Sequence, residues 1–169
     1  MAQLFEPAAA LKSMRKNTLS CYAAFGEVLD NSVQAEADKI FVEFNPKKIG
    51  QKARITSAAF IDNGCGMDTE ILFGCLTIGS SSRLDDVEGI GKFGIGLPFA
   101  SIKQCSDIKV YSKTKTTKWQ SVSLNLSQLT GDDPISKPVE EEPPEKYLKK
   151  VKSNQKLKSS DGECGTIVL

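Results

Sequence analysis

The run EVLDNSVQA, residues 27–35, decides how this chain is interpreted, because it sets two polar side chains into a largely apolar helical stretch. Apolar residues recur at helical spacing over roughly residues 17–36, which predicts an amphipathic helix. Glu27 and Asn31 are four residues apart, so on that helix they share one face and can address the same ligand. An isolated pair of this kind is usually a solvated face. A carboxylate among apolar residues, however, costs desolvation unless it has a partner or a task.

A second motif, DNGCGM at residues 62–67, follows an apolar strand predicted over 57–62. Asp62 at the strand end offers a carboxylate acceptor, and Gly64 and Gly66 allow the backbone to approach a flat ligand closely. The exocyclic amine of adenine is a donor that suits this acceptor. Taken alone, the motif is interpreted equally well as a turn, since Asp-Asn-Gly is good turn chemistry.

The third motif is the glycine series GIGKFGIG, residues 89–96, which runs into a helix start at Leu97. Its backbone N–H groups, with the positive end of the following helix, can form a nest for phosphate oxygens. The series is not a Walker A motif. The series contains the GxGxxG spacing of dinucleotide-binding sites, but no strand leads into it and no βαβ unit surrounds it. A dinucleotide-binding site is therefore not supported.

The remaining segments complete one predicted domain over residues 1–169. The stretch from about 78 to 96 is too long and too rich in Gly and Ser for an ordinary connection, which is typical of a functional lid. Pro-rich and Lys-rich residues at about 131–161 predict an irregular insertion outside the core. The other expected elements are a strand over 38–44 closed by a turn at Asn45-Pro46, a short helix over 68–76, strands over 107–112 and 118–126, and a strand over 165–169. Because the chain stops inside that last apolar strand, we expect an N-terminal fragment of a longer protein.

Composition excludes several classes of function. The 22 basic and 21 acidic residues leave a net charge of +1, so nucleic acid would need a local patch or another domain. The chain has no histidine, which removes Ser-His-Asp and Cys-His catalysis and imidazole-bound metal. The five cysteines are scattered without zinc-site spacing and are interpreted as free thiols in a reducing cytoplasm. No window approaches the ~20 apolar residues of a membrane span.

With these pieces in this order, and a Gly165-Thr166 pair opening the last strand, the chain resembles the GHKL superfamily of ATPases. That superfamily includes gyrase B, the ninety-kilodalton heat-shock chaperones, histidine kinases and MutL. Runs 27–35, 62–67 and 91–98 are most similar to MORC-like ATPases of bacterial type. The resemblance implies a Bergerat fold, an α/β (α+β) two-layer sandwich with a mixed, mainly antiparallel sheet, helices on one face and a flexible lid.

The resemblance also implies roles for individual residues. Glu27 is similar to the general base that orients the attacking water, and Asn31 to the Mg²⁺ ligand. Asp62 is similar to the carboxylate that reads adenine, and Thr166 to the hydroxyl joined to it through water. The remaining implied ATP contacts are Gly64, Gly66 and Met67 around the base, and Gly91, Lys92, Phe93, Gly94, Ile95 and Gly96 around the phosphates.

The implied function is ATP binding and slow, Mg²⁺-dependent hydrolysis that drives lid closure and homodimerisation of a larger protein, with DNA engaged through further domains. Some relatives supply a lysine to the γ-phosphate from a second domain, so we expect weak turnover from this piece and a stand-alone monomer. Two alternatives stay open: the ATP-binding domain of a histidine or serine kinase, and a nucleotide-sensing module that does not hydrolyse ATP. The chain lacks an acceptor histidine, and a sensing module would not need Glu27.

Overall fold

The computed structural model describes residues 7–16, 19–78, 96–127, 135–153 and 163–169, and its centre is one six-stranded sheet. The strand order is β1-β2-β6-β3-β4-β5, and every pairing among the described residues is antiparallel. The strands are β1 Ile40–Ile49, β2 Lys52–Asp62, β3 Asp107–Lys113, β4 Gln120–Asn125, β5 Val139–Glu140 and β6 Gly165–Val168. The last strand in the chain, β6, therefore lies between β2 and β3 and joins two parts of the sheet.

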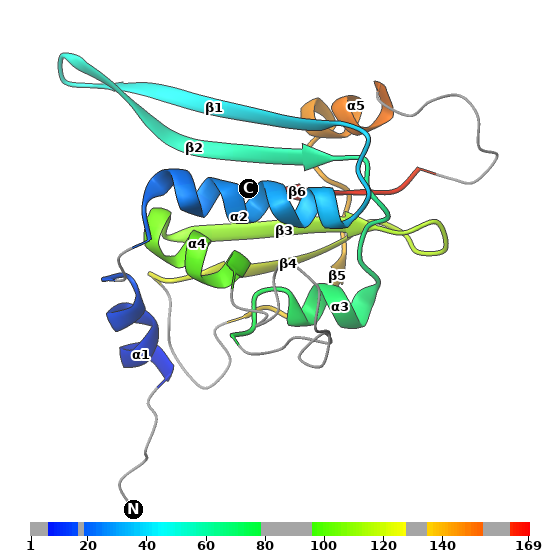
Figure 1. Ribbon diagram of the computed structural model, residues 1–169, viewed down its shortest axis with the longest axis horizontal. Helices are drawn as coiled ribbons and strands as arrows, with labels where there is room; N and C mark the ends of the chain where they lie inside the picture. Colours follow the sequence, from blue (N-terminus) through cyan, green and yellow to red (C-terminus); the bar gives the residue numbers. More distant parts are fainter. Residues whose placement is uncertain (1–6, 17–18, 79–95, 128–134, 154–162) are drawn as a thin grey trace, which may run out of the picture.

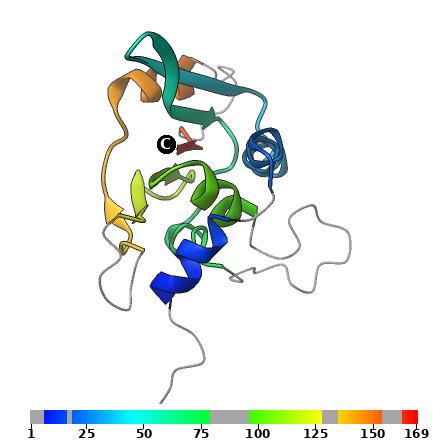
Figure 2. The same cartoon turned by 90° about the vertical axis from the view of Figure 1, so that its left-hand side faces the viewer.

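Four helices lie on one face of this sheet and a fifth lies on the other (Figures 1 and 2). The first four are α1 Pro7–Met14, α2 Cys21–Gln34, α3 Thr69–Gly74 and α4 Gly96–Gln104, and the fifth is α5 Glu145–Ser153. The Ser20 hydroxyl caps α2 by accepting from Ala23 N at 3.1 Å, and Asp68 caps α3 by accepting from Ile71 N at 2.9 Å. Within the described ranges, no helix has the length and apolar character needed to cross a bilayer.

Successive side chains along the strands point to opposite faces of the sheet, and each face has its own hydrophobic core. Val110 packs in a cluster with residues of α1, α3 and α4, whereas its neighbour Tyr111 packs in a cluster on the opposite face. This antiparallel sheet with helices packed on it confirms the predicted α/β class and the Bergerat architecture. The predicted helices and strands near 17–36, 57–62, 68–76, 97, 107–112, 118–126 and 165–169 all exist, with bounds shifted by a few residues.

Residues 135–153 differ from the predicted irregular insertion. Helix α5 places Tyr147 and Val151 in the second core cluster, so this part of the segment belongs to the core. The hydrophobic spacing of α5 was hidden by its four lysines and one glutamate, all of which form ion pairs. The fold thus carries a helix on the sheet face that the two-layer prediction left bare.

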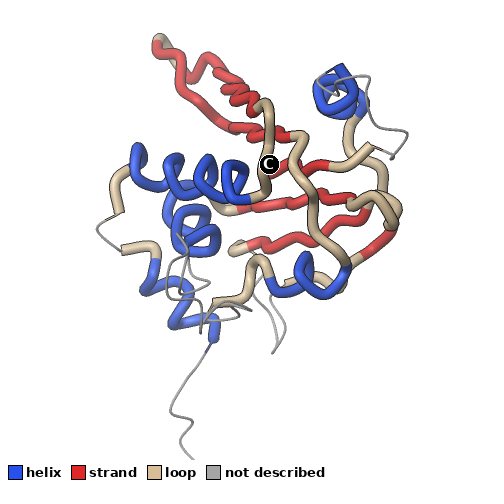
Figure 3. The backbone as a smooth tube through the Cα atoms, turned by 45° about the vertical axis from the view of Figure 1, so that its right-hand side comes forward, coloured by secondary structure: helices blue, strands red, loops and turns tan. Residues whose placement is uncertain are grey.

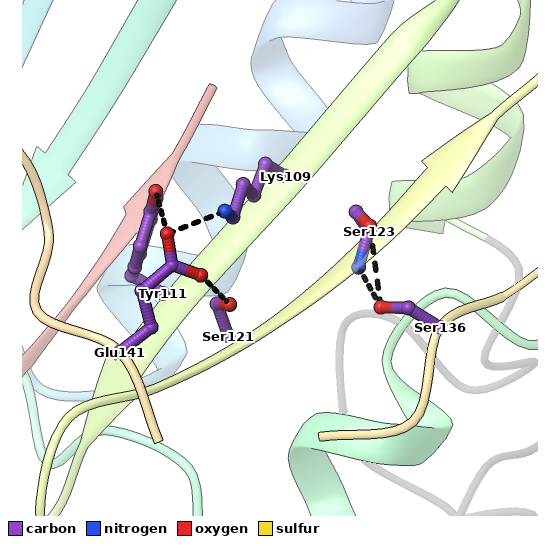
Figure 4. Close-up of polar contacts among 6 residues, drawn as sticks. All are labelled: Lys109, Tyr111, Ser121, Ser123, Ser136 and Glu141. Carbon is purple, nitrogen blue, oxygen red and sulfur yellow. Dashed lines mark hydrogen bonds and ion pairs between the residues drawn. The ribbon is translucent and has the colours of Figure 1, made fainter. Parts of the chain in front are cut away.

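A polar network holds the segment before α5 onto that face (Figure 4). The Glu141 carboxylate accepts hydrogen bonds from Lys109 Nζ at 2.7 Å, Ser121 Oγ at 2.6 Å and Tyr111 Oη at 3.3 Å. The bond from Lys109, with that from Ser121, lowers the pKa of Glu141, so the carboxylate stays ionised at neutral pH. Three strand side chains thereby fix one residue of the connecting segment.

The predicted turn at Asn45-Pro46 is wrong, because β1 continues through it to Ile49. The pairing register shifts there: Asn45 faces Ser57 and Pro46 faces Ile55, which leaves Thr56 as the extra residue of a bulge. The Thr56 hydroxyl donates to the Asn45 carbonyl at 3.1 Å. Pro46 is tolerated because β1 is the edge strand, where a missing N–H breaks no ladder.

Candidate functional site

Helix α2 presents two candidate residues along one flank. Its buried residues Ala24, Val28 and Ser32 are spaced by four and form the stripe that faces the sheet. Glu27 and Asn31 each precede a residue of this stripe, so both lie at the same edge of the helix, one turn apart. Glu27 is half-buried and Asn31 is exposed. The predicted sharing of one helix face therefore follows from the observed helix.

The Glu27 carboxylate lies against the first residue of α4. A Cβ atom added to Gly96 would come within 2.4 Å of Glu27 Oε2, closer than real Cβ atoms approach oxygen. Glycine at position 96 therefore leaves room for the Glu27 carboxylate. The last glycine of the predicted phosphate-binding series and the predicted base are neighbours.

Asp62 is the last residue of β2, and its carboxylate is buried. Oδ1 accepts hydrogen bonds from the backbone N–H of Gly64 at 3.0 Å and of Thr166 at 3.1 Å, and Oδ2 accepts from Ser32 Oγ at 2.9 Å. Burial raises the pKa of Asp62, and these three hydrogen bonds oppose the shift. Because each carboxylate oxygen has two lone pairs, Oδ2 has capacity for one further donor.

Gly64 and Gly66 hold the turn after Asp62 against neighbouring backbone. A Cβ at Gly64 would lie 2.6 Å from the Ala35 carbonyl oxygen at the end of α2. Gly66 has a φ of +72°, and a Cβ there would lie 2.0 Å from the Lys113 carbonyl oxygen. Side chains are excluded at both positions, by contact and, at Gly66, also by conformation. The backbone that follows Asp62 is thereby fixed between α2 and β3.

The hydroxyl of Ser112, a buried residue of β3, connects the other candidates. Ser112 Oγ accepts from Met67 N at 2.8 Å, lies 3.1 Å from the Gly165 carbonyl oxygen and 2.9 Å from Thr166 Oγ1. Ser112 has one hydroxyl hydrogen. When it goes to Gly165, Thr166 donates to Ser112, and when it goes to Thr166, the threonine hydrogen can serve another acceptor. The Thr166 hydroxyl can therefore meet a ligand as donor or as acceptor.

Ser32 and Ser112 are the residues that the sequence reasoning missed. Each is a lone hydroxyl in a buried pattern: Ser32 continues the four-residue stripe of α2, and Ser112 continues the alternation of Ile108 and Val110 in β3. A buried hydroxyl requires a hydrogen-bond partner, so both positions carried a signal for a polar site beneath the helix and the strand.

Part of the predicted site lies outside the described residues. This applies to the predicted lid except its ends, residue 78 and Gly96. It also applies to the predicted phosphate contacts Gly91, Lys92, Phe93, Gly94 and Ile95.

Asp62, Asn31 and Glu27 are connected through α2. The Ser32–Asp62 hydrogen bond joins the buried carboxylate to this helix, Asn31 precedes Ser32 in it, and Glu27 lies one turn before Asn31, against Gly96 at the start of α4. The Asp62 end suits a flat ligand that carries an amine, while the Glu27 end suits a water molecule and anionic groups near a helix N-terminus. The fold and these side chains suit a nucleotide held between helices and an antiparallel sheet.

Asn31 fits the implied metal. Mg²⁺ prefers oxygen ligands and is usually held by one or two protein groups together with water and substrate phosphates. One exposed amide oxygen, one turn of α2 from Glu27, is a suitable donor. Among the described residues, no cluster of three or more His, Cys, Asp or Glu side chains could hold a metal. A metal at this site would therefore be bound jointly with the ligand.

Comparison with protein families agrees with this class. Residues 19–158 match the model of the histidine kinase-, DNA gyrase B-, and HSP90-like ATPases. The chain belongs to this family of ATP-binding ATPases, and the resemblance to the GHKL superfamily is confirmed.

Individual relatives include plant, bacterial and human proteins. Protein MICRORCHIDIA 2 of Arabidopsis thaliana is 30% identical over 124 residues, which is 70% of this chain and 20% of that protein. DNA mismatch repair protein MutL of Pseudothermotoga lettingae is 30% identical over 123 residues, 70% of this chain and 21% of that protein. MORC family CW-type zinc finger protein 1 of Homo sapiens is 31% identical over 99 residues, which is 57% of this chain and 10% of that protein. This chain spans between 10% and 21% of the length of these relatives. The MORC-like resemblance is confirmed.

Proposed function

We propose that this chain binds ATP with Mg²⁺ and hydrolyses it slowly. The observation that carries the proposal is the continuity of the site. Ser32 joins the buried Asp62 to α2, and Asn31 and Glu27 follow along that helix towards Gly96. A nucleotide laid along this line would have its base at the sheet and its phosphates at the start of α4.

At the base end, Asp62 would accept a hydrogen bond from the adenine N6 amine through the remaining lone pair of Oδ2. Gly64, Gly66 and Met67 would line the base, and the Thr166 hydroxyl would reach its ring nitrogen through water. Guanine presents a carbonyl oxygen where adenine presents the amine, and an ionised carboxylate repels that oxygen. The site should therefore discriminate strongly in favour of adenine.

At the phosphate end, Glu27 would orient the attacking water and accept its proton. Asn31 would hold Mg²⁺, which would neutralise the negative charge that develops on the phosphates. Gly91, Lys92, Phe93, Gly94, Ile95 and Gly96 would surround the phosphates. The half-buried position of Glu27 against Gly96 favours hydrolysis over simple sensing, since binding alone needs no base.

For the longer protein, we propose that ATP closes the lid over residues 78–96 and promotes homodimerisation, and that hydrolysis reverses both. An association with DNA is part of the proposal, because one relative is named as a DNA mismatch repair protein. A cytoplasmic location is proposed from the five cysteines, all of which are free.

Calorimetric titration tests the site directly. A non-hydrolysable ATP analogue should bind the chain in the presence of Mg²⁺, more weakly without it, and GTP should bind far more weakly than ATP. Glu27→Ala should keep the affinity for the analogue and lower the ATP turnover of the full-length protein roughly 100-fold or more, the usual contribution of a general base.

Glu70→Ala, at an exposed glutamate in α3, is the matched control and should change neither quantity. Absence of adenine-selective binding would refute the proposed site. Retained turnover in Glu27→Ala would remove Glu27 as the base while leaving the binding site in place.

A further inference from the structure

The outer part of the β1–β2 hairpin, residues 46–57, stands clear of the rest of the molecule. Every residue in this range is exposed, and the hairpin extends beyond α2 at the upper left of Figure 1 and the top of Figure 3. Its tip turns at Gly50, which has a φ of +62°. We call these residues the outer hairpin. The nucleotide site described above uses none of them.

The outer hairpin carries a local positive charge that the net charge of the chain conceals. It contains Lys47, Lys48, Lys52 and Arg54, and no acidic residue occurs between Glu43 and Asp62. The rest of the chain holds the other 18 of 22 basic residues and all 21 acidic residues. Among the ion pairs found within the described ranges, none involves these four cations.

The strand register gathers three of the four cations on one face. Lys47 pairs with Arg54 and Ile49 pairs with Lys52, so Lys47, Lys52 and Arg54 project to the same side. Lys48 pairs with Ala53 on the other side. Lys52 and Arg54 are two apart on β2, roughly 6.6 Å along the strand, and Lys47 lies directly across from Arg54 on β1, so the three charges form a compact cluster. We call this cluster the cationic face.

The chemistry of the outer hairpin selects among possible occupants. A second copy of the hairpin is disfavoured, because like charges would meet. A membrane is disfavoured, because the tip is Gly50-Gln51 and the exposed Ile49 and Ile55 lie on opposite faces, which leaves no single apolar surface to insert. A nucleic-acid backbone offers closely spaced phosphates to a cluster of cations. The major groove of B-form DNA also admits a two-stranded β-ribbon, whereas the deep, narrow major groove of RNA does not.

We propose that the cationic face of the outer hairpin, Lys47, Lys52 and Arg54, binds the phosphate backbone of duplex DNA without reading sequence. This deepens the DNA association in the proposed function by assigning it to residues of this chain. It needs no contact with the nucleotide, so the two proposals can fail separately.

Fluorescence anisotropy with a labelled duplex of about 20 base pairs, titrated with the 169-residue chain from about 50 to 200 mM salt, tests the assignment. The combined variant Lys47→Gln, Lys52→Gln and Arg54→Gln should lower affinity roughly tenfold or more at the lowest salt. Since each phosphate contact contributes a slope of about 0.9 in log affinity against log salt, losing three contacts should reduce that slope by about 2.7.

The control variant Lys16→Gln, Lys48→Gln and Lys137→Gln removes the same charge from exposed lysines outside the cationic face. It should keep most of the slope and affinity. Both variants should melt like the unmodified chain and bind the ATP analogue equally well, which separates this result from the fate of the nucleotide site.

Three results would overturn the proposal. The unmodified chain could fail to bind the duplex, the two variants could lose affinity equally, or RNA duplexes or anionic vesicles could bind more tightly than DNA. Equal loss in the two variants would show an effect of net charge alone.

Discussion

At the scale of single residues, the candidate site is centred on Asp62, a carboxylate whose burial in the ionised form costs folding free energy. Its carboxylate is buried beneath α2, and burial raises its pKa in spite of three hydrogen bonds. A raised carboxyl pKa means that the folded state holds the proton more tightly than the unfolded state does. Stability from this group is thus fully present below the ordinary pKa of 3.8 and is lost as pH rises through the higher folded value. An ionised Asp62 opposes folding at neutral pH, which is expected of a group retained for binding.

Asp62→Asn should separate binding from stability. The amide oxygen can still accept from Gly64 and Thr166, and Ser32 can turn towards the Val28 carbonyl, 3.5 Å away, to accept from the amide nitrogen. The adenine amine would then meet a donor, and adenine nucleotide affinity should fall roughly 10- to 100-fold, as for a lost hydrogen bond to a charged group.

Thermal unfolding between about pH 4 and pH 8 tests the effect of Asp62→Asn on stability. The variant should gain stability relative to the unmodified chain as pH rises, because only the unmodified chain must ionise a buried carboxyl. Unchanged nucleotide affinity, or a stability difference that shrinks with rising pH, would contradict the account.

Candidate ligand-facing residues are easier to recognise in the sequence than the residues that support them. Glu27, Asn31, Asp62 and the turn glycines stand out as polar or glycine residues in apolar surroundings. Ser32 and Ser112 contact other candidate residues, Asp62 in the first case and Met67 and Thr166 in the second. The pairing of β2, β6 and β3 that brings them there is set by contacts distant in sequence.

At the scale of elements, the contact between α2 and α4 controls where the Glu27 carboxylate lies. A methyl group added at Gly96 would meet only the end of the flexible Glu27 side chain, so Gly96→Ala should keep the helix packing and move the carboxylate. We expect the turnover of the full-length protein to fall roughly 10- to 100-fold, since small displacements of a catalytic group have large effects. Affinity for the ATP analogue should change little.

Gly26→Ala is the matched control, because it adds the same methyl group to α2 where no atom lies within 4 Å. It should keep turnover and stabilise α2 by up to about 1 kcal/mol. Steady-state hydrolysis and calorimetric titration of both variants provide the comparison. Equal turnover in the two variants would show that Gly96 does not position Glu27.

The elements that sequence patterns predicted poorly share one physical cause. Helix α5 is short and lysine-rich, and its few apolar residues become a buried stripe only because the sheet offers a second apolar face. The extension of β1 past Pro46 depends on its place at the sheet edge and on a bulge in its partner. Local secondary-structure propensity does not report the second apolar face of the sheet or the edge position of β1, because both exist only in the assembled sheet.

At the scale of the whole molecule, β6 is the element on which the fold depends most. It pairs with β2 on one side and with β3 on the other, and its Ile167 is fully buried. A chain ending at Cys164 should therefore lose more than about 5 kcal/mol, the lower range of domain stability, and should lack cooperative unfolding in urea.

The conservative variant Ile167→Val keeps the strand and should cost only about 1 kcal/mol. Circular dichroism in a urea titration measures both forms. A truncated chain that still unfolds cooperatively would show that the two parts of the sheet are stable without the strand between them.

The central position of this last strand also orders the events of synthesis. The ribosome releases β1 and β2 first, then β3 to β5 and α5, and the strand that must enter between them last of all. Until then β2 and β3 each present an unpaired edge, the kind of surface that invites association with other chains. Asp62 meanwhile lacks its hydrogen bond from Thr166. The candidate site around Asp62 is therefore completed in the same step that closes the sheet.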